Sequence, residues 1–405
     1  MKILHFADLH IGHENYGKID DKTGLSTRLL DFLKAFESIA DYALKNKVDL
    51  VIFAGDAYKT RDPSPTHQRE FGRILKKIAE KIPVAMITGN HDIPPSFGKA
   101  DTLEIYPTLA VPNIHVFSKP TVKKILIAND KQPIAIVALP WILRSSILDE
   151  KERHQPIEKI REILAQKISK IYKNLLGKLD PKIPAIAIVH QSVSGAVFGA
   201  DKDTYMGNDP VIPVSILADP RLSYVALGHL HKHQVLSENP PVIYSGSPER
   251  VDFGESGDKK GFVVAKIDPL KKKKTIVHFE TLPARQFLTI NITIPKAEQH
   301  PNQYVKNEIK KAEVKDAILK INLEGQEAQL CRILESDLRQ ATKEASFVAA
   351  IAKKSEKRLQ KIEISKEHLG PKDWLNQYLE IKKFSQDEQK EIKHLADQLM
   401  EESGQ

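Results

Sequence analysis

Five short polar motifs in this sequence combine side chains that can bind metal ions. They are Asp8-Leu9-His10, Gly55-Asp56, Gly89-Asn90-His91-Asp92, the single His190 and Gly228-His229-Leu230-His231. The donors are carboxylate oxygens, an amide oxygen and imidazole nitrogens, with no cysteine among them. Such mixed ligation suits Mn, Fe or Zn better than Mg, which prefers oxygen ligands and water.

The number of donors indicates two metal ions rather than one. With His91 and Asp92 set aside, seven side chains remain, namely Asp8, His10, Asp56, Asn90, His190, His229 and His231. Seven ligands are too many for one tetrahedral site, but they suit two ions that share a bridging carboxylate. Two ions about 3.5–4 Å apart can clamp a phosphate, activate a water and stabilise the leaving oxygen.

Each motif also has a purely structural interpretation when it is taken alone. Asp56 could cap the following helix, Gly89–Asp92 could form a turn, and His190 could be a hydrogen-bonded core histidine. What the motifs share is their position, because each falls where a predicted strand has just ended. Loops at the carboxyl ends of strands in an open α/β sheet converge on one crevice. We therefore expect these residues to meet at one point.

The elements that would position the motifs alternate between strand and helix. Apolar runs at 2–7, 48–54 and 83–88 predict buried strands, and helical periods at 26–46 and 66–81 predict amphipathic helices between them. This alternation is typical of an α/β layered fold.

Further strands and one long helix are expected downstream. The strands are predicted at 121–128, 134–139, 185–190, 223–227, 242–245, 261–268 and 274–281, and the charged helix at 156–176. Short strands close together near 120–140 and 260–281 predict antiparallel additions to the sheet. The Lys271–Lys274 run between two of them is best interpreted as a solvated hairpin turn, with a DNA-binding patch as the alternative.

A domain boundary is predicted near 283–285. Beyond it, strands at 287–294, 317–323 and 346–352 alternate with helices, the first from about 301, and form a small α+β unit. Gly370-Pro371 then breaks the chain. Two short helices are expected after the break, at 371–382 and 385–402.

Composition and charge describe a globular protein with a basic N-terminal region. The chain has 405 residues, of which 41% are hydrophobic and 28% charged, enough for two or three domains. The net charge is +8, yet residues 296–405 hold 20 basic and 20 acidic residues, so the surplus belongs to 1–295. A basic region indicates an anionic partner, with an ordinary basic surface as the alternative.

The expected compartment is a reducing cytoplasm. Cys331 is the only cysteine, which excludes an internal disulfide and a cysteine-based zinc site. The N-terminus enters a strand that already carries Asp8 and His10, so no signal peptide is expected. No apolar run approaches about 18 residues, so no membrane helix is expected either.

The complete motif set resembles the calcineurin-like metallophosphoesterase superfamily, whose pattern is D-x-H, G-D, G-N-H-D, H and G-H-x-H. The resemblance implies a four-layer α-β-β-α sandwich. It implies that one metal is bound by Asp8, His10, Asp56 and His231, and the other by Asp56, Asn90, His190 and His229. His91 would then be the proton donor or transition-state contact, with Asp92 orienting its imidazole.

Longer segments narrow the resemblance to DNA double-strand-break repair nucleases of the SbcD type, which act in DNA repair and recombination. These segments are HFADLHIGHENYG, GDAYKTRDPSP, HQSVSG, GHLHKHQ and YSGSPERVDFGE. The resemblance implies an Mn-dependent nuclease domain at 1–284, an α+β capping domain at 285–370 that helps to hold DNA, and C-terminal helices at 371–405. The fold class is thus α/β, with a small capping domain and C-terminal helices.

The same family implies a homodimer and an SMC-like ATPase partner, SbcC. Helices 66–81 and 99–109 are plausible dimer surfaces. An apolar face for the ATPase could be formed by Trp374, Leu375, Tyr378, Leu379 and Ile381, although these residues could equally pack on their own domain.

One position departs from the family pattern. Many relatives carry a histidine three residues after the bridging aspartate, and here that position is Lys59. A lysine can contact phosphate but cannot shuttle protons near neutral pH, which leaves the balance of exonuclease and endonuclease activity open. Lys59 and Arg61 are candidate DNA contacts, with a solvated loop as the alternative. Two alternative functions are a small-molecule phosphodiesterase or phosphatase, and a DNA-tethering scaffold whose catalysis is dispensable.

Overall fold

The computed structural model describes residues 1–94, 98–127, 133–197, 209–268, 274–355, 375, 379 and 386–402. The chain divides into two compact units, Met1–Ser355 and Glu356–Gln405. The helix expected at 371–382, with Trp374, Tyr378 and Ile381, lies outside the described residues except for Leu375 and Leu379. Lys271–Lys273 of the lysine run lie outside them too. The three-part division at 284 and 370 remains a prediction.

The first unit is built on two six-stranded sheets. The first sheet has the strand order β14-β13-β1-β2-β3-β4. Its strands are β1 (Lys2–Phe6), β2 (Leu50–Phe53), β3 (Val84–Ile87), β4 (Ile114–Phe117), β13 (Gly261–Lys266) and β14 (Ile276–Thr281). Strands β1 to β4 run parallel, whereas β13 is antiparallel to both β1 and β14.

The second sheet has the order β11-β12-β10-β7-β6-β5. Its strands are β5 (Thr121–Leu126), β6 (Pro133–Leu139), β7 (Ala185–His190), β10 (Leu222–Gly228), β11 (Gln234–Glu238) and β12 (Pro241–Tyr244). Strands β6, β7, β10 and β12 run parallel, and β5 and β11 are antiparallel edge strands. The antiparallel additions predicted near 120–140 and 260–281 are therefore confirmed. Strands β4 and β11 were not predicted.

The two sheets pack face to face, because their strands are apolar on both faces. One core lies between the sheets and includes Ile3 and Ile52 from the first sheet, and Ile136 and Ile188 from the second. Strands that are buried on both faces read as continuous apolar runs, which is what the sequence contains at these positions.

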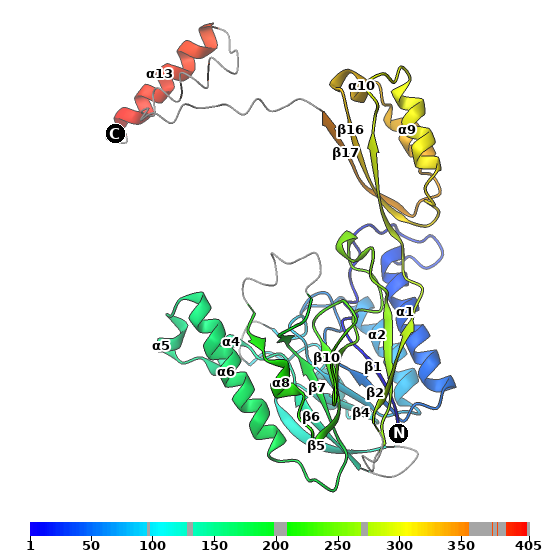
Figure 1. Ribbon diagram of the computed structural model, residues 1–405, viewed down its shortest axis with the longest axis vertical. Helices are drawn as coiled ribbons and strands as arrows, with labels where there is room; N and C mark the ends of the chain where they lie inside the picture. Colours follow the sequence, from blue (N-terminus) through cyan, green and yellow to red (C-terminus); the bar gives the residue numbers. More distant parts are fainter. Residues whose placement is uncertain are drawn as a thin grey trace. The chain divides into compact units, whose positions relative to one another are not determined.

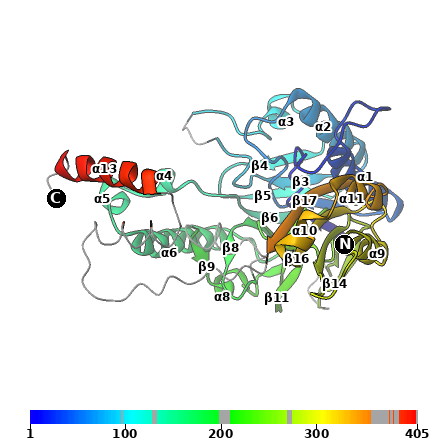
Figure 2. The same ribbon diagram turned by 90° about the horizontal axis from the view of Figure 1, so that it is seen from above.

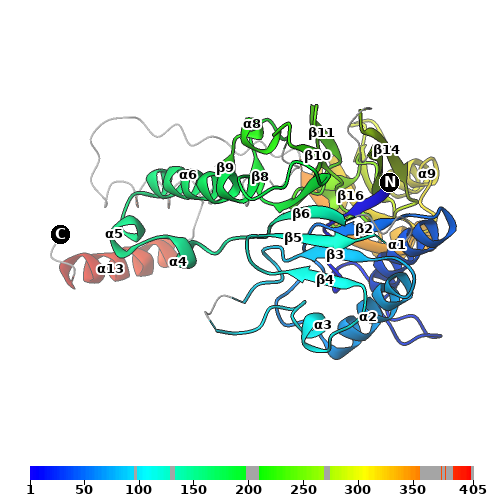
Figure 3. The same ribbon diagram turned by 90° about the horizontal axis from the view of Figure 1, so that it is seen from below.

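Helices cover the outer face of each sheet, as Figure 3 shows. On the first sheet, α1 (Thr27–Lys45) and α2 (Pro65–Ala79) bury one apolar stripe each, with Phe36 and Phe71 in a common core. The N-terminus of α2 follows from its sequence, since Ser64 Oγ accepts a hydrogen bond from the His67 backbone at 3.2 Å and Pro65 follows.

On the second sheet, α6 (Ile157–Leu176) and α8 (Val214–Leu217) occupy the corresponding layer. The predicted four-layer α-β-β-α sandwich is thus confirmed. Short elements complete this part of the chain: α3 (Ile105–Thr108), α4 (Arg144–Ile147), α5 (Glu150–Arg153), the paired β8 (Ser192–Val193) and β9 (Val211–Ile212), and the 3-10 turn η1 (Phe253–Glu255).

A third sheet follows within the same unit, drawn in yellow and orange in Figure 1. Its strands β15 (Phe287–Thr293), β16 (Ile318–Gly325) and β17 (Phe347–Ser355) all run parallel. Helices α9 (Pro301–Lys310), α10 (Glu327–Cys331) and α11 (Glu335–Ala341) connect these strands and pack on them through Val305, Leu330 and Leu338. The elements predicted here from the sequence are confirmed.

The second unit contains α13 (Gln386–Glu402), which agrees with the helix expected at 385–402.

Viewed from above, the layers of the first unit are again distinct (Figure 2). Among the described residues, no helix has both the length and the apolar character needed to cross a membrane.

Candidate metal centre

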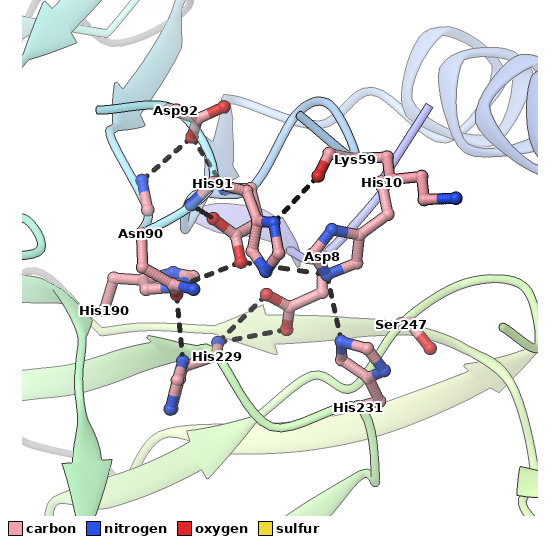
Figure 4. Close-up of polar contacts among 12 residues, drawn as sticks. Asp8, His10, Lys59, Asn90, His91, Asp92, His190, His229, His231 and Ser247 are labelled. Carbon is pink, nitrogen blue, oxygen red and sulfur yellow. Dashed lines mark hydrogen bonds and ion pairs between the residues drawn. The ribbon is translucent and has the colours of Figure 1, made fainter. Parts of the chain in front are cut away.

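The loops at the carboxyl ends of the parallel strands bring the predicted ligands together (Figure 4). Asp8 and His10 follow β1, Asp56 follows β2 and Asn90 follows β3. His190 is the last residue of β7, and His229 and His231 follow β10. The convergence expected from motif position is therefore present in the fold.

Several of these residues have an unusual backbone conformation. The φ angles of Asp8, His10, Asp56 and His229 are 54°, 44°, 59° and 107°, in a region that non-glycine residues rarely adopt. Neighbouring loops hold this conformation, because the Asp8 amide donates to Gly55 O at 3.0 Å and the His10 amide to Asp56 O at 3.1 Å. Such conformations gather at functional sites, where they aim side chains that a relaxed backbone would not.

The glycines that begin three of the motifs are required by close approach. A Cβ atom at Gly89 would lie 2.0 Å from Asp56 Oδ1, and one at Gly228 would lie 2.1 Å from Ala54 O. A Cβ atom at Gly55 would lie 2.5 Å from His190 Nδ1, and its φ is 99°. Glycine alone fits at these positions, so it brings the loops close enough for their ligands to meet.

One half of the centre is formed by Asn90, His190 and His229 around Asp56. Asn90 Oδ1 lies 3.1 Å from both His190 Nε2 and His229 Nδ1. His190 Nε2 also lies 3.4 Å from Asp56 Oδ2. The Nδ1 atom of His190 is engaged on the other side, 2.6 Å from Ala54 O, so its Nε2 atom is the one presented to the centre.

The other half is formed by His10 and His231 beside the same carboxylate. Their Nε2 atoms lie 2.9 Å apart, and His10 Nε2 lies 3.7 Å from Asp56 Oδ2. Asp8 is held between the halves, since its two oxygens accept from the His229 amide at 3.0 and 3.1 Å.

The donor set fits two divalent cations. Ligand atoms of His10, Asp56 and His91 lie within 4.8 Å of one another, and so do those of Asp8, Asp56 and His190. Asp56 belongs to both groups, as a bridging carboxylate would. The Nε2 atoms of His10 and His231 lie 2.9 Å apart, close enough for both to bind one cation.

Burial and charge shift the pKa values of the central groups in opposite directions. Burial raises the pKa of Asp56, but the positive charge of His190 and its hydrogen bond outweigh burial and leave the pKa well below the usual range. Burial lowers the pKa of His190, yet the charge of Asp56 outweighs it and raises that pKa to about 9. Burial raises the pKa of Asp8. Perturbed groups gathered in one place are typical of a functional site.

The structure corrects one predicted contact. Asp92 does not orient the His91 imidazole, because its carboxylate accepts from the backbone amides of Asp56, Ala57 and Gly89 at 2.8, 3.0 and 2.8 Å. It also accepts from Thr102 Oγ1 at 3.1 Å. Asp92 therefore holds the loop after β2 against the loop after β3.

The His91 ring is held instead by a backbone carbonyl. Its Nδ1 atom lies 2.8 Å from Lys59 O, and its amide donates to Asp56 Oδ1 at 2.9 Å. Because a carbonyl oxygen can only accept, the Nδ1 proton stays on His91 and Nε2 is left for chemistry. The Lys59 side chain is half-buried, with Nζ 3.5 Å from Asn15 Oδ1, and Arg61 is exposed. Their role as DNA contacts remains a prediction.

Four further residues border the centre and were not singled out in the sequence. Glu255 Oε1 lies 2.6 Å from His231 Nδ1, and Lys260 Nζ lies 2.6 Å from Glu255 Oε2. The Trp141 ring packs on His229 with centroids 5.2 Å apart, and the half-buried His13 ring meets His10 edge-on at 5.8 Å. Glu255 lies within the segment YSGSPERVDFGE, whose resemblance to the family was the only signal available for it.

Comparison with known proteins gives a consistent result. A family model described as calcineurin-like phosphoesterase matches residues 1–233. The SbcD component of nuclease SbcCD from Escherichia coli (strain K12) is 28% identical over 268 residues, covering 64% of this chain and 63% of that protein. DNA double-strand break repair protein Mre11 of Archaeoglobus fulgidus is 26% identical over 283 residues, covering 66% of this chain and 57% of that protein.

Both alignments thus span less than two thirds of the relative's own length. Among solved structures, a dimetal phosphatase from Danio rerio is similar over 69% of this chain and 96% of its own, with a TM-score of 0.42 and 11% identity.

Proposed function

Because this chain belongs to the calcineurin-like phosphoesterase family, we propose that it is an Mn-dependent nuclease that hydrolyses phosphodiester bonds at DNA ends. The observation that carries the proposal is the pair of donor clusters that share Asp56, one with His10 and the half-buried His91 and the other with Asp8 and His190. One relative is named as a nuclease subunit and another as a DNA double-strand break repair protein, and together with the basic surplus of residues 1–295 these names favour DNA as the substrate.

Each group has a defined task under this proposal. Asp8, His10, Asp56 and His231 would hold one ion, and Asp56, Asn90, His190 and His229 the other. Bound there, the two ions would clamp the phosphate and lower the pKa of an attacking water. His91 would contact the phosphate or the departing sugar oxygen through Nε2, while Lys59 O fixes its ring. Lys59 and Arg61 would contact the DNA backbone.

The wider assembly is proposed from the same relatives. We propose a homodimer that works with an SbcC-type ATPase, which the C-terminal helices would contact. DNA binding through phosphate contacts should weaken steeply as salt rises, because each phosphate contact releases counterions.

The test compares cleavage and binding in one protein preparation. The protein is stripped of metal, reloaded with Mn²⁺, and assayed on a blunt-ended duplex, on single-stranded DNA and on a small phosphodiester. We expect cleavage of DNA that a chelator abolishes. Rapid hydrolysis of the small diester with no cleavage of DNA would favour the small-molecule alternative and contradict the proposal.

A His91→Ala variant separates catalysis from tethering. Loss of a general acid should lower the cleavage rate roughly 100-fold or more, while duplex binding in gel shift stays close to wild type. The matched control is His278→Ala, which removes an exposed histidine of β14. If His91→Ala cleaved DNA as fast as wild type, His91 would have no part in the mechanism. If wild type bound DNA but never cleaved it, the scaffold alternative would stand.

A further inference from the structure

The ring of His231 is held from the side that faces away from the metal ligands. Its Nδ1 atom lies 2.6 Å from Glu255 Oε1, while its Nε2 atom faces His10 Nε2 at 2.9 Å. An ionised carboxylate can only accept a hydrogen bond, so the shared proton must sit on Nδ1. The Nε2 lone pair is then directed into the centre.

Glu255 is itself fixed by two further contacts. Its side chain is 9% exposed, its Oε2 atom lies 2.6 Å from Lys260 Nζ, and the same oxygen accepts from the Val251 amide at 3.0 Å. The Lys260 ammonium lies directly against this carboxylate and stabilises its ionised form, so Glu255 is held as an anion between Lys260 and the His231 ring.

Lys260 is an unusual residue, because its side chain has no exposed area. Its ammonium has three protons, and each has an acceptor: Glu255 Oε2, Ser247 Oγ at 2.9 Å and His231 O at 3.2 Å. A buried lysine persists only where it is paired and fully hydrogen-bonded. Lys260 thus forms an ion pair with Glu255 and donates a hydrogen bond to the backbone oxygen of His231.

The other half of the centre is built differently. His190 Nδ1 lies 2.6 Å from the neutral backbone oxygen of Ala54. A charged acceptor raises the basicity of a ligand imidazole more than a neutral one does, and partners of this kind typically change metal affinity roughly 10- to 100-fold. His231 and His190 therefore differ in the charge behind the ring, whereas His229 of the second half has a carboxylate beside it, with Nε2 3.4 Å from Asp209 Oδ2.

We propose that Glu255 is the positioning residue of His231, with Lys260 as its buried counter-ion, and that this pair sets metal affinity at the His10–His231 half alone. The inference rests on the proposed metal-dependent function. Glu255 touches neither substrate nor ion in this scheme, and it acts only through the orientation and basicity of one imidazole.

The experiment measures metal binding without DNA. Free Mn²⁺ is followed by electron paramagnetic resonance as it is titrated into wild type, Glu255→Gln and the double variant Glu255→Gln/Lys260→Met. Wild type should bind two ions per chain. Glu255→Gln should weaken one of the two sites roughly 10- to 100-fold and leave the other unchanged.

Two further variants keep the result interpretable. The double variant removes both buried charges, so it tests the proposal if Glu255→Gln alone fails to fold, and the same single site should weaken. Glu249→Gln is the matched control, because Glu249 is a carboxylate of similar burial that contacts Arg28 and the Arg250 and Arg285 amides, none of them a proposed ligand. It should bind both ions with wild-type affinity.

A second readout reports the ring directly. In protein labelled with ¹⁵N-histidine and loaded with diamagnetic Zn²⁺, His231 should carry its proton on Nδ1, and this signature should change in the Glu255 variants. If wild type binds two Mn²⁺ ions and the Glu255 variants bind them with unchanged affinity, the positioning role is overturned. The nuclease proposal would then remain intact. Wild type that binds no Mn²⁺ would instead overturn the proposed function.

Discussion

At the scale of single residues, the Asp56 carboxylate contributes to both halves of the centre. Its Oδ2 atom lies 3.4 Å from His190 Nε2 and 3.7 Å from His10 Nε2, and its Oδ1 atom accepts from the His91 amide. Each half therefore depends on the same side chain, which also orients the residue proposed to act on the phosphate.

Replacing Asp56 with Asn should disable both halves at once. The amide keeps one oxygen but loses the charge that two cations would share, so Mn²⁺ binding should fall at both sites. Cleavage should fall roughly 100-fold or more, the scale seen when one electrostatic contact to a transition state is removed. The measurements are metal content after desalting and the initial cleavage rate. Two ions retained at wild-type affinity would show that Asp56 does not bridge.

Gly89 offers a test of the close approach between loops. A Cβ atom there would lie 2.0 Å from Asp56 Oδ1, a separation that real contacts do not reach, so Gly89→Ala must displace the Asp56 side chain. We expect an intact fold by circular dichroism with weakened Mn²⁺ binding and cleavage. Gly257→Ala is the control, because a Cβ atom at Gly257 meets nothing within 4 Å. Wild-type metal binding by Gly89→Ala would contradict this account of the glycine.

At the scale of elements, the sheets join through polar as well as apolar contacts. His5 of β1 is fully buried between them, and its Nδ1 atom lies 2.9 Å from the Tyr224 hydroxyl of β10. Burial lowers the pKa of His5 to about 3, so the fold requires the neutral ring. The buried neutral ring contributes fully to the free energy of unfolding above the pKa of histidine in the unfolded chain, about 6.5. This contribution is lost as the pH falls from there towards 3.

The predicted consequence is an acid-sensitive sandwich. Between pH 7.5 and pH 5, protonation of His5 in the unfolded chain should remove about 2 kcal/mol of stability. A glutamine at this position can still form a hydrogen bond with the Tyr224 hydroxyl but does not titrate. Between pH 7.5 and pH 5, the free energy of unfolding of His5→Gln should therefore fall by about 2 kcal/mol less than that of wild type. Urea unfolding of both proteins at the two pH values measures the difference. An identical fall in the two proteins would refute the assignment to His5.

The sequence predicted the elements whose patterns are long and apolar, and these elements position the centre. The helix expected at 26–46 is Thr27–Lys45, and the strands expected at 48–54 and 83–88 contain β2 and β3. The unpredicted strands β4 and β11 are short and partly exposed, so their apolar signal is weak. The position of a motif at the end of a buried strand therefore predicts that its side chains meet those of the other motifs, because the parallel strands end at the same edge of the sheet.

Contacts between loops could not be predicted in the same way. The family pattern predicts that Asp92 contacts its neighbour His91, yet the Asp92 carboxylate accepts from amides of the loop after β2, 35 and 36 residues away. Glu255 lies 24 residues beyond His231, on a 3-10 turn with no periodic pattern. Both partners depend on tertiary packing, which local sequence does not encode.

At the scale of the first unit, the third sheet is joined to the centre through its first strand. The Phe287 ring at the start of β15 packs edge-on against Phe253 of η1 at 5.0 Å, and Glu255 ends the same turn. Just before β15, Arg285 pairs with Asp31 of α1, and its amide donates to Glu249 at 3.0 Å. The turn that holds His231 is thus shared between the centre and the third sheet.

At the scale of the whole molecule, the division after Ser355 predicts that the two units have separate roles. Ending the chain at Lys357, just beyond β17, should leave the fold and the centre of the first unit intact. The unfolding temperature of the first unit should stay close to that of the full chain, because this compact unit ends at Ser355. Differential scanning calorimetry and Mn²⁺-dependent cleavage of DNA ends would measure both properties.

The same truncation should abolish binding to an SbcC-type ATPase, if the C-terminal segment is its contact as proposed. Leu395 and Leu399 on α13 are 53% and 63% exposed, which leaves apolar surface for a partner. Leu395→Asp in the full chain is the finer probe, because it should weaken copurification with the ATPase while cleavage by the isolated protein stays at wild-type rate. A truncated chain that aggregates or no longer binds Mn²⁺ would mean that residues 358–405 support the first unit. A truncated chain that still copurifies with the ATPase would place the contact within Met1–Ser355.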